Sequence, residues 1–160
     1  SVGAMAASMR STVTSEAAAH GSAFPAALVS ILGEPGMSIE ILRRILGVSH
    51  SGTVRLLDQL EAEGLVERKA GPDGRTVALH LTASGRRQAK AVQEARRGVL
   101  DDTLRLLTDQ ERAQLLRLSA KLLGGLTRDR AHSDHICRLC DLAVCPGSTC
   151  PVECAVAGAA

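Results

Sequence analysis

The feature that most constrains the fold is a block of residues, 38–81, in which two short helical patterns are followed by two β-type runs. Over residues 38–46, apolar side chains recur at helical spacing, and a serine at the start provides a hydroxyl that can cap the helix. Gly47 is expected to end that helix, and a second helix with its own apolar stripe is expected over residues 49–63. The two β-type runs flank a Gly-Pro-Asp-Gly sequence, which predicts a hairpin. This order predicts a helix-turn-helix followed by a β-wing.

Further helical patterns lie on both sides of this block, so the expected fold class is mainly α with a small β-wing. Thr108 and Glu111 form a capping box, which begins a leucine-rich helix that is expected to end at Gly124-Gly125. A wide leucine face is typical of a dimer interface, although packing within one chain explains it equally well. The expected divisions are a disordered tail over residues 1–11, N-terminal helices of the dimerisation region over 12–37, the winged helix-turn-helix over 38–85, C-terminal dimerisation helices over 86–127, and a cysteine-rich segment over 128–160.

All five cysteines lie in this last part, which we call the cysteine segment: they are Cys137, Cys140, Cys145, Cys150 and Cys154. Metal ions and iron–sulfur clusters need several thiolates within bonding distance, and closely spaced cysteines supply them with little loss of loop entropy. Cys137 and Cys140 form a compact pair. Cys145 and Cys150 each precede a proline, which should keep the backbone out of helix and turn the chain around a central ion. We therefore expect these four thiols to be the ligands, with Cys154 as a spare candidate.

Spacing alone does not identify what the cysteine segment binds. An iron–sulfur cluster is the first choice, zinc the second, and redox-reactive or incidental thiols the third. His132 and His135 could replace one thiolate. Disulfides fit less well, because five cysteines leave one unpaired and the first residues do not have the pattern of a secretion signal. Without its metal, the segment from Arg128 onward is expected to have little regular structure.

Charge is unevenly distributed along the chain. Residues 43–97 hold eleven Lys and Arg against six Asp and Glu, whereas the remainder has an excess of acids. Such asymmetry is expected when one region faces a polyanion, although a solvated surface can also have it. The sequence has no Trp or Tyr and a single Phe24, so the stacking surfaces that bind single-stranded nucleic acids are missing. Any nucleic acid partner is therefore expected to be double-stranded DNA.

Two other classes of protein fit the sequence poorly. No stretch approaches the roughly 18 consecutive apolar residues of a membrane-spanning helix, so we expect no membrane association and a cytoplasmic location. No Ser/His/Asp arrangement, phosphate-binding loop or pair of acids supports catalysis, so the chain is not expected to be an enzyme.

Four pieces of the expected winged helix resemble the MarR family of bacterial regulators. They are Leu46-Gly47-Val48-Ser49, the run from Thr53 to Arg68, the wing sequence Asp73-Gly74-Arg75, and Leu81-Thr82-Ala83-Ser84-Gly85. The resemblance implies a homodimer that binds a pseudo-palindromic duplex operator, with the helix over residues 49–63 of each subunit in a major groove. It extends more loosely over residues 12–125 and does not cover the cysteine segment.

The resemblance also indicates which side chains contact DNA. At the start of the recognition helix, the expected contacts are small or polar residues that can approach bases and phosphates closely: Ser49, His50, Ser51, Gly52 and Thr53. N-capping alone would also explain a serine here. Arg55 can donate to guanine or to phosphate. In the wing, Asp73 is expected to hold the hairpin while Arg75 reaches the minor groove, which attracts arginine by its shape.

These expectations lead to one hypothesis and two alternatives. The hypothesis is a dimeric DNA-binding transcriptional regulator, with repression favoured, whose cysteine segment carries an iron–sulfur cluster or metal that senses redox or metal status. In the first alternative, the segment holds a purely structural zinc and the regulator responds to a small-molecule effector. In the second, the winged helix is a protein–protein interaction module, whose binding would tolerate the loss of Arg55 and Arg75.

Overall fold

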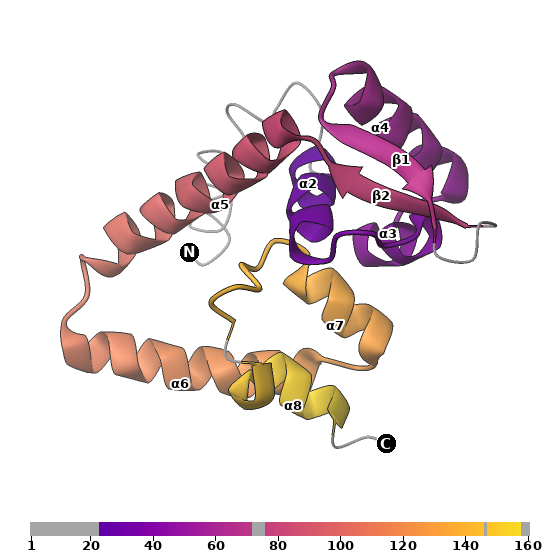
Figure 1. Cartoon of the computed structure of the whole chain (residues 1–160). Helices are drawn as coiled ribbons and strands as arrows, with labels where there is room; N and C mark the ends of the chain where they lie inside the picture. Colours follow the sequence, from indigo (N-terminus) through magenta and orange to yellow (C-terminus); the bar gives the residue numbers. More distant parts are fainter. Residues whose placement is uncertain (1–22, 72–75, 146, 158–160) are drawn as a thin grey trace.

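The computed structural model of the chain describes residues 23–71, 76–145 and 147–157 (Figure 1). Its elements are, in order, α2 (Ala23–Gly33), α3 (Ile39–Leu46), α4 (His50–Ala62), β1 (Val66–Ala70), β2 (Val77–Leu81), α5 (Ala83–Leu104), α6 (Asp109–Leu126), α7 (Arg130–Cys137), the 3-10 helix η1 (Gly147–Thr149) and α8 (Pro151–Ala157). This mainly helical fold with a two-stranded antiparallel sheet confirms the expected fold class. The tail expected over residues 1–11 lies outside the described residues. Among the described helices, none has the length and apolar composition needed to cross a membrane.

Capping residues set the ends of the helix-turn-helix where the sequence predicts them. α3 begins after Ser38, whose hydroxyl accepts a hydrogen bond from the Ile41 backbone N–H at 3.2 Å. Gly47 ends α3 with a φ of 66°, a left-handed conformation that glycine adopts without steric cost. α4 begins after Ser49, whose hydroxyl accepts from the Gly52 N–H. The turn between the two helices is therefore confirmed as a short glycine turn.

The wing is an antiparallel hairpin of β1 and β2, in which Val66 lies opposite Leu81. The segment before α3 extends this sheet, because the Leu79 N–H donates to the Met37 carbonyl at 3.0 Å. A two-stranded hairpin alone is marginally stable in water. These backbone hydrogen bonds tie the hairpin to the helix-turn-helix and hold it in place.

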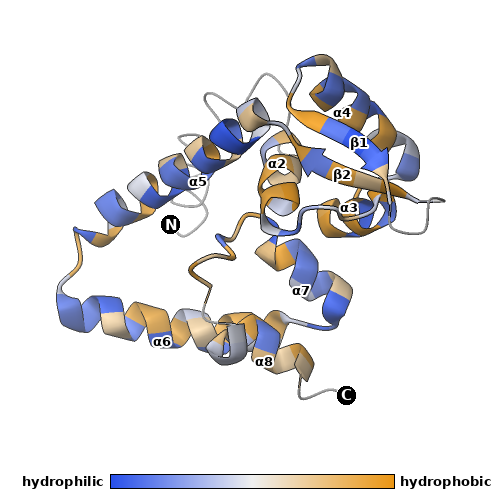
Figure 2. Ribbon diagram, in the orientation of Figure 1, coloured by the Kyte–Doolittle hydropathy of each residue, from blue (hydrophilic) through white to orange (hydrophobic). Residues whose placement is uncertain are grey.

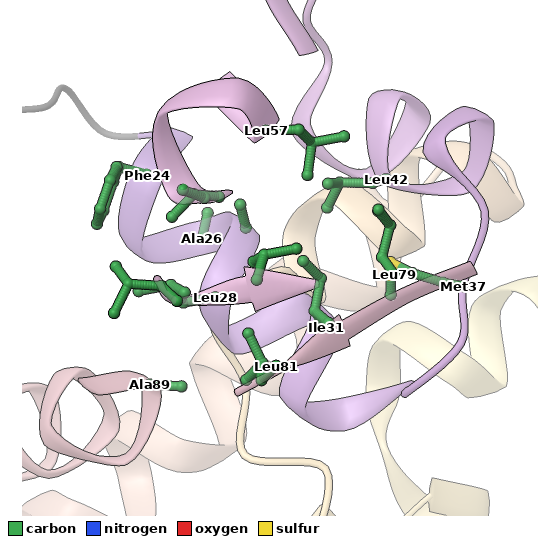
Figure 3. Packing of buried hydrophobic residues seen from close by; sticks show 14 of the residues in the cluster. Phe24, Ala26, Leu28, Ile31, Met37, Leu42, Leu57, Leu79, Leu81 and Ala89 are labelled. Atoms are coloured by element: carbon green, nitrogen blue, oxygen red, sulfur yellow. The ribbon is translucent and has the colours of Figure 1, made fainter. Parts of the chain in front are cut away.

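α2 supplies the centre of the hydrophobic core, as Figure 3 shows. Its residues Leu28 and Ile31 are fully buried, together with Leu42 of α3, Leu57 of α4 and Leu79 of β2. Burying a leucine or isoleucine side chain fully contributes about 1.5–3 kcal/mol. A helix that the sequence assigned to the dimerisation region therefore also forms the core on which the helix-turn-helix and the wing pack.

α5 leads away from the winged helix, and α6 follows it at the far end of the molecule (Figure 1). α6 begins with the predicted capping box: the Thr108 hydroxyl accepts from the Glu111 N–H, and the Glu111 carboxylate accepts from the Thr108 N–H at 2.8 Å. The helix continues to Leu126, past the glycine pair where the sequence predicted its end. No residue of α6 is buried, and Leu116 and Leu122 are 72% and 63% exposed. Figure 2 shows apolar residues along much of this helix, so its own chain covers this apolar surface only in part.

The cysteine segment is more regular than the sequence predicted. α7 begins after Asp129, whose carboxylate accepts from the His132 N–H at 2.8 Å. α8 begins at Pro151 and packs against α6. The expectation that the prolines keep the backbone out of helix is wrong at Pro151, because the first helical position needs no N–H donor and suits the fixed φ of proline. Two short helices therefore form in a segment that was expected to have little regular structure.

Candidate functional site

The solvent-facing side of α4 begins with a group of polar side chains. His50, Ser51 and Arg55 are exposed on this helix. Ser49 is exposed as well, although its hydroxyl already accepts from the Gly52 N–H at 3.1 Å. Gly52 keeps this end of the helix compact, since a Cβ there would lie 3.1 Å from the Ser49 hydroxyl oxygen. The exposed side chains and the helix N-terminus together favour an anionic ligand such as a phosphate group.

The structure corrects the prediction for Thr53. Its side chain is fully buried, and its hydroxyl donates to the Ser49 carbonyl at 3.0 Å. Residues four apart lie on the same face of a helix, so Thr53 points in the same direction as Leu57, which is also fully buried. Thr53 is therefore a core residue, and its assignment as a DNA contact is wrong.

A basic residue that sequence reasoning missed holds the wing against α4. Arg68 of β1 donates to Asp58 Oδ1 and to Glu61 Oε2, in both cases at 2.7 Å. Its backbone N–H also donates to Glu61 Oε1 at 3.3 Å. The signal was present in the sequence as two acids three residues apart on one helix face, followed by an arginine on the next strand. Arg68 therefore positions the wing relative to α4 through ion pairs within the chain.

The predicted wing contacts, Asp73 and Arg75, lie outside the described residues. The residues on either side of 72–75 are described, and there the Gly71 N–H donates to the Thr76 carbonyl at 2.8 Å. Gly71 is buried, and a Cβ at this position would lie 2.3 Å from Thr76 Oγ1. The hairpin closes at this tight pair, and the roles of Asp73 and Arg75 stay predictions.

Four thiols gather near the C-terminal end of α7. Cys137 is the last residue of that helix, and the Cys140 N–H donates to the Cys137 carbonyl at 2.8 Å, which folds the two cysteines into a tight turn. Burial raises the pKa of Cys137 to about 12, and the neighbouring thiols of Cys140, Cys150 and Cys145 add to this increase. Burial also raises the pKa of Cys140. The four cysteines that the sequence suggested as ligands are therefore near enough to influence one another electrostatically.

The thiols do not form a closed metal site as they stand. Within the described ranges, no three His, Cys, Asp or Glu side chains converge closely enough to hold a metal ion. Instead, Cys137, Cys140, Cys145 and Cys154 line a cavity of about 650 Å³, together with Val29 of α2 and Ile45 of α3. A single ion would have to draw the thiols together into this space.

The spare cysteine and the two nearby histidines have other partners. The Cys154 thiol donates to the Ser148 carbonyl at 3.2 Å. The ring nitrogen Nδ1 of His132 accepts from the Arg128 N–H at 3.3 Å. His135 donates from Nδ1 to a backbone carbonyl of α3 at 2.8 Å. Cys154 nevertheless lines the same cavity as Cys137, Cys140 and Cys145, so the choice of four ligands stays a prediction.

The sequence profile of the MarR family matches residues 26–76, which run from α2 through the wing turn. Over these residues, the winged helix is similar to the MarR family. Among proteins with curated descriptions, the winged helix is also similar to YwhA of Bacillus subtilis, an uncharacterised HTH-type transcriptional regulator, with 37% identity over 84 residues. The aligned region is 52% of this chain and 60% of YwhA, so the chain spans about three fifths of that relative's length.

Two solved structures resemble the winged helix and the helices beside it. The YusO protein of Bacillus subtilis has a TM-score of 0.66 and 22% identity, with 76% of this chain and 88% of YusO covered. FabT of Streptococcus pneumoniae, whose structure is in complex with DNA, has a TM-score of 0.59 and 21% identity, with 64% of this chain and 73% of FabT covered. At these identities the likeness concerns the fold alone.

Proposed function

We propose that the chain is a transcriptional regulator of the MarR type that binds double-stranded DNA through α4 and the wing. The observation that carries this proposal is the exposed polar start of α4, where Ser51 and Arg55 face solvent. A major groove about 12 Å wide admits a helix, and arginine can donate two hydrogen bonds to one guanine. The relatives support the proposal, since YwhA is described as a transcriptional regulator and FabT has been crystallised with DNA.

We propose further that the regulator is a homodimer joined through α6 and the helices beside it. Leu116, Leu122 and Leu126 are 72%, 63% and 63% exposed in the single chain. Burying apolar surface in a dimer contributes roughly 25 cal/mol to the free energy of association for each Å² buried. A dimer would present its two recognition helices to half-sites about 34–36 Å apart, so a pseudo-palindromic operator is expected. Such a dimer bound at a promoter would obstruct transcription, which favours repression, and its place of action would be the cytoplasm.

The cysteine segment is proposed to bind an iron–sulfur cluster, or alternatively zinc, through Cys137, Cys140, Cys145 and Cys150. Burial and, after it, the neighbouring thiols raise the pKa of Cys137, so ionisation of the group is unfavourable until a cation compensates. The cavity beside these thiols is larger than a single ion needs, which is the reason for preferring a cluster. A change in redox status or metal supply would then alter the bound group and, through it, the activity of the regulator. If the segment holds only a structural zinc, a small-molecule effector would regulate the protein instead.

DNA binding is tested by titrating the full chain with duplexes that it selects from a random library. Arg55→Ala should lower the affinity, and the slope of log affinity against log salt should fall by about 0.9 for each phosphate that the variant no longer neutralises. Arg75→Ala should weaken binding across many sequences while the protein stays folded. Arg105→Ala is a matched control, because this arginine pairs with Asp102 at 2.9 Å at the far end of α5. Unchanged binding by both of the first two variants would favour the protein–protein interaction module.

The bound group is identified from the absorption spectrum of anaerobically purified protein, with iron, zinc and acid-labile sulfide measured on the same sample. Iron together with sulfide would establish a cluster. About one zinc per chain would establish the alternative. Protein that contains neither, and takes up neither on reconstitution, would refute the proposed site.

A further inference from the structure

The cysteine segment touches the helix-turn-helix at its turn. The Nδ1 atom of His135 lies 2.8 Å from the carbonyl oxygen of Ile45. A carbonyl oxygen only accepts, so Nδ1 carries the proton and donates it to this bond. Ile45 lies in the last turn of α3, where the carbonyl groups have no later helical N–H to accept from. His135 therefore supplies the donor that the end of α3 lacks.

The imidazole ring of His135 also packs against the residue that makes the turn. A Cβ added to Gly47 would lie 3.4 Å from both Cε1 and Nδ1 of this ring. Gly47 ends α3, and Ser49, two residues later, is the N-cap of α4. The position of His135 therefore bears on the residues that set the direction in which α4 leaves the turn.

The stretch that follows His135 is held on two further sides. Ser30 of α2 donates through its hydroxyl to the Arg138 carbonyl at 3.3 Å. Arg97 of α5 pairs with Asp141 at 3.1 Å. Residues 135–141 therefore lie across α2, α3 and α5, and this stretch contains two of the four candidate metal ligands.

We infer that a metal ion or cluster bound by the cysteine segment strengthens DNA binding by holding α7 against the turn of the helix-turn-helix, with His135 as the positioning residue. This inference rests on the proposed function. α7 has eight residues, a length at which a helix is marginal by itself. Ligation through Cys137 would join the end of α7 to thiols later in the chain, and the closed loop would restrict its movement away from α3.

The arrangement of the helices indicates the direction of this effect. α7 packs against α3, and in Figure 1 α4 stands on the opposite side of α3 from α7. A docked α7 therefore leaves the exposed side of α4 open to DNA. Metal binding would favour one geometry of the turn and so raise affinity, whereas metal loss would release α7 and lower it.

The test measures the DNA affinity of the full chain in two states: loaded with Zn²⁺, or with iron and sulfide, and stripped of metal by a chelator. The DNA is a duplex selected by the loaded wild type. Stripping should lower DNA affinity by about fivefold or more, the lower end of usual couplings between sites. His135→Ala should bind as much metal as the wild type but show less than about a twofold difference between the two states. His135→Asn keeps an N–H donor near the Ile45 carbonyl and should restore most of the difference.

His132→Ala is the matched control, because His132 lies on the same helix and its ring bonds to Arg128 instead of α3. It should respond to stripping as the wild type does. In the wild type, amide exchange over residues 47–51 should quicken when the metal is removed. Three results would overturn the inference and leave the proposed DNA binding intact. The protein could bind no metal, its DNA affinity or amide exchange rate could stay the same after metal removal, or His135→Ala could respond to metal removal as the wild type does. A wild type that binds no duplex in either state would overturn the proposed function itself, and the inference with it.

Discussion

Replacing Gly85 with alanine should destabilise the winged helix, because the start of α5 leaves no space for a side chain there. A Cβ on this residue would lie 2.0 Å from the Leu65 carbonyl oxygen and 2.9 Å from the carbonyl carbon. Both are backbone atoms, so no side-chain rotation relieves the overlap. The backbone of α5 or of the segment leading into β1 would have to move by roughly 1.5 Å to reach ordinary contact distance.

Three contributions set the size of the effect. Overpacking of this kind typically costs about 1–3 kcal/mol. The Leu65 carbonyl also accepts from the Thr82 N–H at 3.0 Å, and weakening that bond costs up to about 1 kcal/mol. The higher helix propensity of alanine relative to glycine offsets about 1 kcal/mol of this loss in the free energy of unfolding. The net loss of about 2 kcal/mol should lower the Tm by about 4–8 °C in a chain of this size.

Urea and thermal unfolding, followed by far-UV circular dichroism, measure this loss. Gly98→Ala is the control, because Gly98 lies in the same helix and no described atom of the chain would come within 4 Å of its Cβ. That substitution should stabilise the protein by up to about 1 kcal/mol. The reasoning would be refuted if Gly85→Ala were as stable as the wild type, or if both substitutions stabilised the protein equally.

The remaining predictions concern residues of the candidate sites. Thr53→Val should leave DNA affinity within about twofold, because the residue is buried and the Ser49 carbonyl keeps its bond from the residue 53 N–H; weaker binding in a titration, at unchanged stability, would show that the hydroxyl reaches DNA. Arg68→Met should cost about 1–2 kcal/mol in urea unfolding and weaken DNA binding by freeing the wing, whereas Lys69→Met, on the same strand, should do neither. In metal-free protein, the Tm should fall as the pH rises from 9.0 toward about 12, since the thiol of Cys137 ionises at lower pH when unfolded than when folded; melts of Cys137→Ala should lack this part of the pH dependence, and an identical alkaline profile in that variant would count against it.

The helix boundaries could be predicted from the sequence because the signals that set them are local. The caps at Ser38, Ser49 and Thr108 each act on an N–H three residues away, and Gly47 adopts a conformation that few other residues tolerate. The cysteine segment shows where local signals mislead. Pro151 was expected to prevent helix formation, but a proline at the first helical position is compatible with the helix that follows it.

The residues of the candidate site were harder to predict, because exposure depends on packing between distant parts of the chain. A threonine at the start of a helix can face DNA or the core, and for Thr53 the apolar residue that shares its face, Leu57, comes one turn later. Arginine is a residue type that commonly contacts phosphates, but Arg68 forms ion pairs with Asp58 and Glu61 and so holds the wing against α4. The contact between His135 and Ile45 joins residues 90 positions apart, so no local pattern indicates it.

The sequence by itself determined the order of the elements, the caps at their ends, the basic middle of the chain and the place of all five cysteines. Tertiary structure alone decided which side of α4 is buried, which thiols become neighbours, and that α7 lies against the turn of the helix-turn-helix. The physical reason is the range of the interactions. Hydrogen bonds at helix ends and turns join residues a few positions apart, whereas burial and contacts such as that between His135 and Ile45 depend on how the whole chain packs.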